Sequence, residues 1–229
     1  MSFVVNAFAF LHRLLSSARA PTVFENRRDA ALKLAARLIQ YKGKNPLVLG
    51  IPRGAVPMAR IIAQELEGEV DVELVRKLRA PGNPELAVGS VDESGWTHVP
   101  GYAASTGADA AYVEQEKQQQ LEVIRQRRAL YSGGRDSIDP AGRTVIVVDD
   151  GLATGSTMIA ALHALRQRHP ARLICAVPVA PPETAAEVAK GCDELVCLET
   201  PEYFYAVGQF YRHFPQVEDD EVVAALNGS

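Results

Sequence analysis

Short apolar runs alternate along the chain with longer stretches in which apolar side chains recur at helical spacing. Runs of the first kind are typical of buried strands, and the second pattern is typical of helices that pack by one face. Elements that alternate in this way predict an α/β fold with a mainly parallel, doubly wound sheet. The predicted strands are residues 47–51, 70–75, 144–149, 172–179 and 194–198, and the predicted helices are residues 26–41, 54–66, 109–131, 157–168 and 183–190.

Residues 78–108 break this alternation because they are rich in glycine, proline, serine and asparagine. Short strands are expected only near residues 86–91 and 96–99. A long irregular stretch inside a compact domain is typical of a functional loop or lid. The helix that follows carries a polar run at residues 114–120, which we interpret as a charged outer face.

Residues 1–23 are expected to form an N-terminal extension, and residues 24–229 a single domain. Apolar residues fall close to helical spacing in the extension, which favours an amphipathic helix that docks on the domain or on another subunit. A signal peptide is a weaker alternative, because no positive charge precedes the apolar run. The run is also too short to span a membrane. A misassigned start codon is a third alternative.

Composition narrows the function classes. The 229-residue chain has a formal net charge of -4, which gives no support for nucleic-acid binding. Its three cysteines form no Cys-x-x-Cys pair and are odd in number, a usage that suits a reducing cytoplasm. Cys175 and Cys197 lie inside strand patterns and are expected to be small buried hydrophobic residues. The five histidines are far apart in the sequence and predict no metal cluster.

Residues 145–157 bring two carboxylates and a hydroxyl-rich loop together where a buried strand ends. Asp149 and Asp150 close the strand, and a glycine-containing loop with three hydroxyl side chains leads into the next helix. Backbone N–H groups at a helix N-terminus bind phosphate, and ligands gather at the carboxyl ends of strands in such sheets. The carboxylates suit ribose hydroxyls or Mg²⁺. The stretch therefore predicts a site for a sugar phosphate.

This stretch resembles the phosphoribosyl pyrophosphate (PRPP) motif of type I phosphoribosyltransferases, with Gly151 as the departure where the family usually has an aliphatic residue. The resemblance covers roughly residues 24–215. It implies the fold of that family, with a flexible loop and a small hood, and it implies that Asp149 and Asp150 hold the ribose hydroxyls, directly or through Mg²⁺. The residues implied to cradle the 5′-phosphate are Ala153, Thr154, Gly155, Ser156 and Thr157.

Two further segments match the family's pyrophosphate site. Arg53 and Gly54 follow the first core strand, where type I phosphoribosyltransferases have a pyrophosphate loop that often contains a strained peptide bond. A simple strand–helix turn with a surface arginine is the alternative. Arg76 and Lys77 are similar to the pair that precedes the flexible loop of orotate phosphoribosyltransferases. The resemblance implies that they bind pyrophosphate, with Lys77 taking part in catalysis, while residues 78–100 close over it and exclude water.

The acceptor is less well defined. Pro201 and Phe204 keep the spacing of the base-stacking segment of purine-salvage enzymes, so Phe204 or Tyr205 is a candidate to stack a flat acceptor. The alternative is that these aromatics form the core of the hood or a dimer contact. Ala153 and Ala180 stand where 6-oxopurine enzymes carry an aspartate and a lysine, which argues against hypoxanthine, guanine and xanthine. Adenine stays possible, because adenine phosphoribosyltransferases carry a similar Ala-Thr-Gly loop.

The expected activity is an Mg²⁺-dependent phosphoribosyltransferase, a pentosyltransferase of nucleotide metabolism. It would move the 5-phosphoribosyl group from PRPP to a nitrogen of a base-like acceptor and release pyrophosphate. The alternative is a non-catalytic PRPP sensor or regulator on the same fold. The expected partners are PRPP and a small acceptor, without nucleic acid or membrane, in a homo-oligomer, most simply a dimer.

Overall fold

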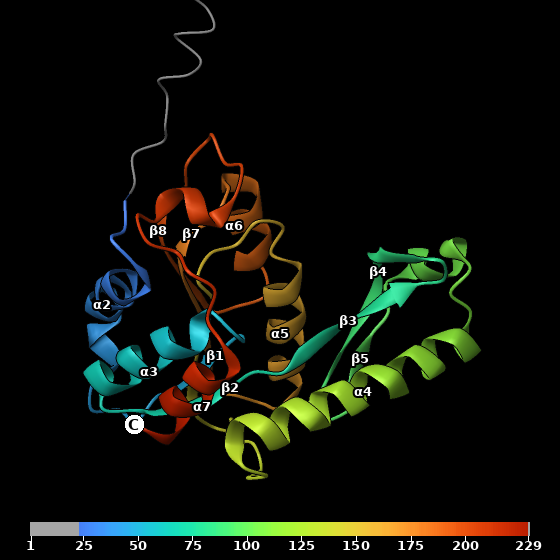
Figure 1. Cartoon of the computed structure of the whole chain (residues 1–229), viewed down its shortest axis with the longest axis horizontal. Coiled ribbons are helices and arrows are strands. Elements are labelled where there is room, and N and C mark those ends of the chain that lie inside the picture. Colours follow the sequence, from blue (N-terminus) through green and yellow to red (C-terminus); the bar gives the residue numbers. More distant parts are fainter. Residues whose placement is uncertain (1–22, 229) are drawn as a thin grey trace, which may run out of the picture.

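The structure is a computed structural model that describes residues 23–228, apart from the side chains of residues 84 and 85. Its centre is a five-stranded sheet in the order β2-β1-β6-β7-β8, in which every neighbouring pair runs parallel (Figure 1). The predicted mainly parallel sheet is therefore confirmed. Its strands are β1 (Leu47–Gly50), β2 (Glu69–Val72), β6 (Thr144–Val148), β7 (Arg172–Val179) and β8 (Glu194–Glu199).

Helices cover both faces of this sheet. Side chains alternate between the faces of a strand, so Val145 and Val147 pack on one side of β6 while Ile146 and Val148 pack on the other. The first pair lies in a cluster with α5 and α6, and the second in a cluster with α2 and α3, as a doubly wound sheet requires. The helices are α2 (Arg27–Arg37), α3 (Ala55–Leu66), α5 (Ser156–Gln167) and α6 (Pro182–Ala189), with a short 3₁₀ turn η1 (Ile39–Tyr41).

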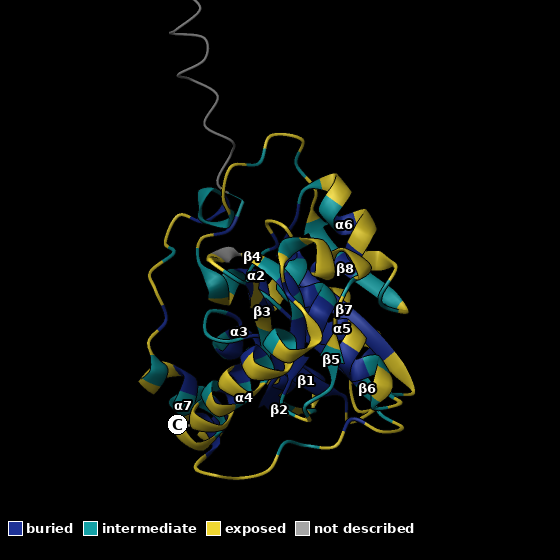
Figure 2. Cartoon of the chain, turned by 90° about the vertical axis from the view of Figure 1, so that its right-hand side faces the viewer, coloured by how far each residue is buried: buried dark blue, intermediate teal, exposed yellow. Residues whose placement is uncertain are grey.

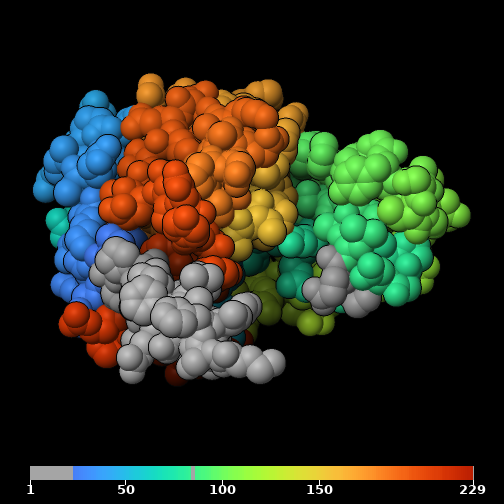
Figure 3. Space-filling view, turned by 90° about the horizontal axis from the view of Figure 1, so that it is seen from above, coloured from blue at the N-terminus to red at the C-terminus, as the bar shows by residue number. Residues whose placement is uncertain are grey.

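Residues 75–132, which we call the arm, project to one side of the sheet body (Figures 1 and 3). The short strands expected near residues 86–91 and 96–99 are confirmed as β4 and β5, but the remainder of residues 78–108 is more regular than the predicted loop. The arm contains an antiparallel sheet in the order β3-β4-β5, followed by a 3₁₀ segment and a long helix. Its elements are β3 (Val75–Ala80), β4 (Asn83–Asp92), β5 (Thr97–His98), η2 (Gly101–Thr106) and α4 (Ala110–Ser132).

The arm has a small core of its own, which explains why strands form there. Leu78, Val88 and Val91 are fully buried and lie in a cluster with Ile124 of α4. The glycines that suggested a loop make the turns instead: Gly82, with φ of 68°, joins β3 to β4, and Gly95, with φ of 84°, lies between β4 and β5.

The polar run of α4 is only partly an outer face. Its outward side is exposed, as Figure 2 shows, but Glu116 and Gln120 are buried against β3. The arm also contacts the sheet body through His98 of β5 and His163 of α5, whose parallel rings stack with centroids 5.2 Å apart. β3 and β4 of the arm also lie against α5.

The C-terminal part adds two elements that the pattern did not predict, η3 (Val207–Phe210) and α7 (Asp219–Asn227). Val222 and Leu226 of α7 are buried in the same cluster as the arm core. The predicted helix within residues 1–23 lies outside the described residues, except for its last position. Among residues 23–228, no helix combines the length and the apolar character needed to cross a membrane.

Candidate active site

The phosphate loop, residues 151–157, joins the end of β6 to α5 as the sequence predicts. Gly155 has φ of 69° and caps the N-terminus of α5, and a Cβ there would lie 2.9 Å from Cγ2 of Thr184. Thr154 and Ser156 hydroxyls lie 3.1 Å apart. The loop lines a recess of about 180 Å³ at the helix N-terminus, together with Asp149 and Lys77. Backbone donors and hydroxyls on an open recess are suited to a phosphate.

Gly151, the departure from the motif, has a local structural cause. Its φ is 152°, and a Cβ at this position would lie 2.5 Å from Cγ1 of Val207. Val207 begins η3, so the C-terminal segment occupies the space that a larger side chain would need. Glycine here allows the segment to pack closely against the loop.

The two carboxylates lie beside the loop and are only partly exposed. The backbone N–H of Asp150 donates to Oδ1 of Asp149 at 2.8 Å. Burial raises the pKa of Asp149 well above its ordinary value, and the charge of Asp150 raises it further. Burial also raises the pKa of Asp150, whereas Arg27 opposes that shift. Adjacent acids of this kind suit hydroxyl donors or a divalent cation, which would hold both in the ionised form.

Arg27, which sequence reasoning missed, is the partner of Asp150. Its Nε and Nη2 both lie 2.8 Å from Oδ2 of Asp150, and its Nη1 donates to the carbonyl of Pro215 at 2.6 Å. The guanidinium carbon lies 3.7 Å from the ring centroid of Phe214. Arg27 is separated from Asp150 by 123 positions, so no local motif links them. The contact arises because α2 and the segment before α7 meet over the end of β6.

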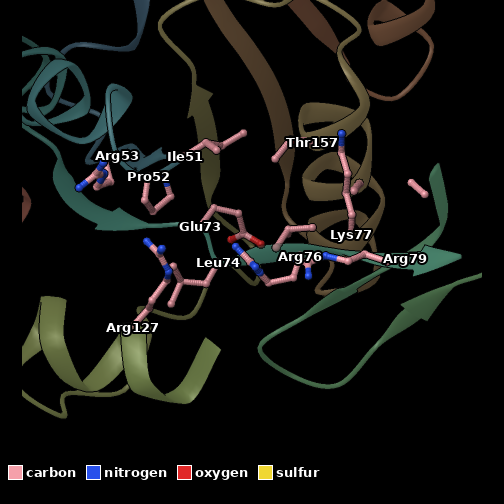
Figure 4. Close-up of a pocket in the computed structure, with 13 residues that line it drawn as sticks. Ile51, Pro52, Arg53, Glu73, Leu74, Arg76, Lys77, Arg79, Arg127 and Thr157 are labelled. Atoms are coloured by element: carbon pink, nitrogen blue, oxygen red, sulfur yellow. The ribbon is translucent and has the colours of Figure 1, made fainter. Parts of the chain in front are cut away.

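A second, larger cavity of about 610 Å³ opens beside the recess (Figure 4). We call it the cationic cavity because five basic residues line it, from the loop after β1, from β3 and from α4. Lys77 and Thr157 line both the recess and this cavity, so the two spaces adjoin. The basic lining residues are Arg53, Arg76, Lys77, Arg79 and Arg127.

The loop after β1 has two different roles at this site. The Pro52–Arg53 peptide bond is cis. Arg53 lines the cationic cavity, yet its guanidinium forms an ion pair with Glu218 at 3.0 Å, just before α7. Gly54 lies against Asp150, because a Cβ there would be 2.0 Å from Oδ2 of that residue. The structure therefore places Arg53 at the cavity and Gly54 at the carboxylates.

The arm supplies the other cations. Arg76 Nε donates to Oε1 of Gln120 at 3.0 Å, and burial followed by the charges of Arg127 and Arg79 lowers the pKa of Arg76. Neighbouring cations that depress one another's pKa favour an anion between them. Glu73 also lines the cavity although it is acidic, and burial raises its pKa to about 8. Glu73, Arg79 and Arg127 were not predicted from the sequence as site residues.

The structure does not bring the two predicted stacking residues into either space. Phe204 is partly buried and packs on Phe210, with ring centroids 5.3 Å apart, at the edge of the main core cluster. Tyr205 is 89% exposed. The contacts of Phe204 are those expected of a hood core, whereas Tyr205 is free to meet a ligand or another molecule.

Comparison with known proteins identifies the family of this chain. Residues 23–214 match a family described as the phosphoribosyl transferase domain. Two Mycobacterium tuberculosis proteins, from strains CDC 1551 and H37Rv, are each 43% identical over 206 residues, and their names assign them provisionally as phosphoribosyl transferases. The match covers 90% of this chain but 46% of each relative, so the chain spans about half the length of these curated relatives.

A solved structure is similar over nearly its whole length. The crystal structure of TT1426 from Thermus thermophilus shares 44% sequence identity with this chain and superposes with a TM-score of 0.80. The alignment covers 89% of this chain and 97% of that one. The extent of the family match and this likeness lead to one assignment: the chain belongs to the phosphoribosyl transferase family.

Proposed function

We propose that this chain transfers the 5-phosphoribosyl group from PRPP to a nitrogen of a base-like acceptor and releases pyrophosphate, with Mg²⁺ as cofactor. The observation that carries the proposal is the adjacency of two anion sites. The recess at the N-terminus of α5 and the cationic cavity share Lys77 and Thr157, and Asp149 borders the recess. PRPP carries a monophosphate and a diphosphate on one ribose, so its charges match this arrangement.

Each part of PRPP then has a place. The phosphate loop (Ala153, Thr154, Gly155, Ser156 and Thr157) holds the 5′-phosphate through N–H groups and hydroxyls. Asp149 and Asp150 hold the ribose hydroxyls. The same two carboxylates would hold Mg²⁺ through the ribose or water, and the metal would supply positive charge for the pyrophosphate oxygens. Arg53, Arg76 and Lys77 bind the pyrophosphate in the cationic cavity. Gly54, expected from the sequence to join them, lies against Asp150 instead and lets the loop after β1 approach it. The phosphate loop and the two acids lie next to each other at the end of β6, which supports placing the 5′-phosphate and the ribose there.

Catalysis in this proposal depends on placement and charge. The bond from C1′ of the ribose to pyrophosphate breaks as the acceptor nitrogen approaches, which gives the sugar oxocarbenium character. Lys77, at the junction of the two spaces, stabilises the negative charge that develops on the leaving pyrophosphate. The protein residues need form no covalent bond, since alignment of donor and acceptor supplies much of the acceleration.

The acceptor would enter beside residues 200–214, where the exposed Tyr205 would stack on it. Phe204 could stack only after leaving its packing on Phe210. Ala153 is exposed and Ala180 is fully buried, and neither side chain can exchange a proton or read an oxo group. The proposed acceptor is therefore a base other than a 6-oxopurine, and adenine belongs in any panel of candidates.

One observation favours a second function, a PRPP-binding sensor without turnover. Asp150 is paired with Arg27 and Arg53 is paired with Glu218, so two groups expected to contact PRPP are engaged within the protein. A sensor could use PRPP to exchange these ion pairs. The cations of β3 and the cavity between arm and body favour the enzyme.

The test is calorimetric titration with PRPP and Mg²⁺, followed by an assay of pyrophosphate release against a panel of bases. Binding with release for one base supports the enzyme, and binding without release supports the sensor. The Asp149→Asn and Asp150→Asn variants should each weaken PRPP binding at least about tenfold, because each loses a carboxylate that accepts a hydrogen bond from a ribose hydroxyl. Asp136→Asn, at an exposed position away from the site, is the matched control. Unchanged affinity in the first two variants would contradict the ribose assignment.

A further inference from the structure

Glu73 is acidic, whereas the other charged residues that the structure places on the wall of the cationic cavity are all basic. It directly follows β2, and its backbone N–H donates to the carbonyl of Gly50 at 3.1 Å, which fixes it at the edge of the main sheet. The residue is only 5% exposed. Its carboxyl group lies between the Pro52 loop and Arg76 and faces the cavity, as Figure 4 shows.

The carboxyl group of Glu73 has no hydrogen-bond or ion-pair partner among the side chains that the structure describes. Buried carboxylates are normally paired, and an ionised acid among several arginines would be expected to form an ion pair. Charged groups approach Glu73 from each neighbouring element. They are Arg53 after β1, Arg76, Lys77 and Arg79 on β3, Asp92 and Glu93 around the end of β4, Arg127 and Arg128 on α4, and Arg168 at the end of α5.

The balance of these influences favours the neutral acid. Burial is the largest effect, the charges of Glu93 and Asp92 act in the same direction, and Arg168 and Arg128 oppose it, so the pKa of Glu73 is raised to about 8. A protonated carboxyl has one O–H donor, whereas an ionised one only accepts. Near neutral pH, Glu73 therefore presents a donor to the cationic cavity.

We propose that Glu73 is a binding residue for the diphosphate group in the cationic cavity and donates its carboxyl O–H to a phosphate oxygen. The proposal rests on the proposed function, in which this cavity holds pyrophosphate. The proton stays on Glu73 and no covalent bond changes. An ionised Glu73 would repel the anion and could not donate, so binding of pyrophosphate requires the protonated residue.

Pyrophosphate with Mg²⁺ is the probe, titrated calorimetrically into the full chain. If only the protonated form binds, affinity should fall about tenfold more between about pH 7 and about pH 9 in the unmodified protein than in Glu73→Gln. The amide keeps an N–H donor but cannot ionise. Changes in the charge of pyrophosphate itself are common to both proteins and cancel in this comparison.

Two further variants make the test specific. Glu65→Gln removes the same charge from an exposed position on α3 and should keep the pH dependence of the unmodified protein. Glu73→Ala, which has no donor, should bind pyrophosphate more weakly than Glu73→Gln at about pH 7. Titrations in buffers of different ionisation enthalpy should show about one more proton taken up by the unmodified protein at about pH 9 than by Glu73→Gln.

The outcomes separate this inference from the proposed function. If the unmodified protein binds pyrophosphate with the same pH dependence as Glu73→Gln, the role of Glu73 is wrong while the cavity assignment stands. If the unmodified protein binds neither pyrophosphate nor PRPP, the proposed function fails. Thermal unfolding supplies a check on folding. Because the pKa of Glu73 is higher in the folded than in the unfolded state, the stability contributed by its neutral form is lost between about pH 4.5 and about pH 8. The melting temperature of the unmodified protein should therefore fall more across this range than that of Glu73→Gln.

Discussion

Gly54 and Asp150 show how tightly single residues are fitted at this site. Gly54 has φ of -57°, a conformation that any residue adopts, so its backbone does not require glycine. The available space does, because a Cβ would approach Oδ2 of Asp150 to 2.0 Å and Nε of Arg27 to 3.0 Å. The absent side chain thus lets the loop after β1 lie against the ion pair of Asp150.

Gly54→Ala should displace Asp150 and separate it from Arg27. We expect a loss of about 1–3 kcal/mol in the free energy of unfolding, typical of overpacking a close contact, together with weaker PRPP binding. Chemical denaturation and calorimetry would measure the two effects. Gly101→Ala is the matched control, since nothing lies within 4 Å of a Cβ there. If Gly54→Ala is as stable and binds as well as the control, the fit around Asp150 is looser than these distances imply.

The contiguous parts of the site were predictable at the residue scale. Asp149, Asp150 and the hydroxyl loop lie in one strand–turn–helix unit. Residue type and spacing were therefore enough to predict that they lie close together. Arg27 and Glu73 had no such signal. Arg27 reaches Asp150 only through the packing of α2. Nothing in the sequence around Glu73 indicates that its side chain is buried.

At the scale of elements, α4 supports the cations of β3. Gln120 accepts from Arg76, Glu116 accepts from the backbone N–H of Arg79, and Gln120 also donates to Glu116 at 3.0 Å. The polar run that was interpreted as an outer face therefore includes a buried support for β3. The arm was only partly predictable from the sequence. Short strands were expected near β4 and β5, but β3 and the extent of the arm sheet were not, because the apolar core is small and glycines mark the turns. Most strands of the sheet body, in contrast, contain continuous apolar runs that indicate them directly.

Gln120→Leu should leave the helix intact but remove the acceptor from Arg76. Pyrophosphate affinity should fall by about 1–2 kcal/mol, because the guanidinium loses the contact that orients it within the cavity. Titration with pyrophosphate and Mg²⁺ measures this change. Gln119→Leu, the same substitution at the adjacent exposed position, should bind as the unmodified protein does. Equal losses in the two variants would point to a general effect on α4 instead.

At the scale of the whole molecule, the residues that line the site among positions 23–228 come from the sheet body and the arm, and the C-terminal segment contacts Arg27 and Arg53. A variant lacking residues 1–20 should therefore keep its PRPP affinity, while its oligomeric state is expected to change if the extension docks on another subunit. Calorimetry and light scattering of the two proteins at equal concentration test both statements. Loss of PRPP binding would show that the extension contributes to the site.

The contacts of Arg27 with Asp150, Phe214 and Pro215 link local opening of the chain to the charge state of the site. Arg27 joins the first turn of α2 to Phe214 and Pro215 and at the same time neutralises Asp150. Any local opening that detaches either segment must break this ion pair, so the opening free energy and the charge state of the carboxylates are thermodynamically linked. A ligand that competes with Arg27 for Asp150 would loosen both segments, and hydrogen exchange near residues 24–27 and 211–215 would then report on occupancy of the ribose site.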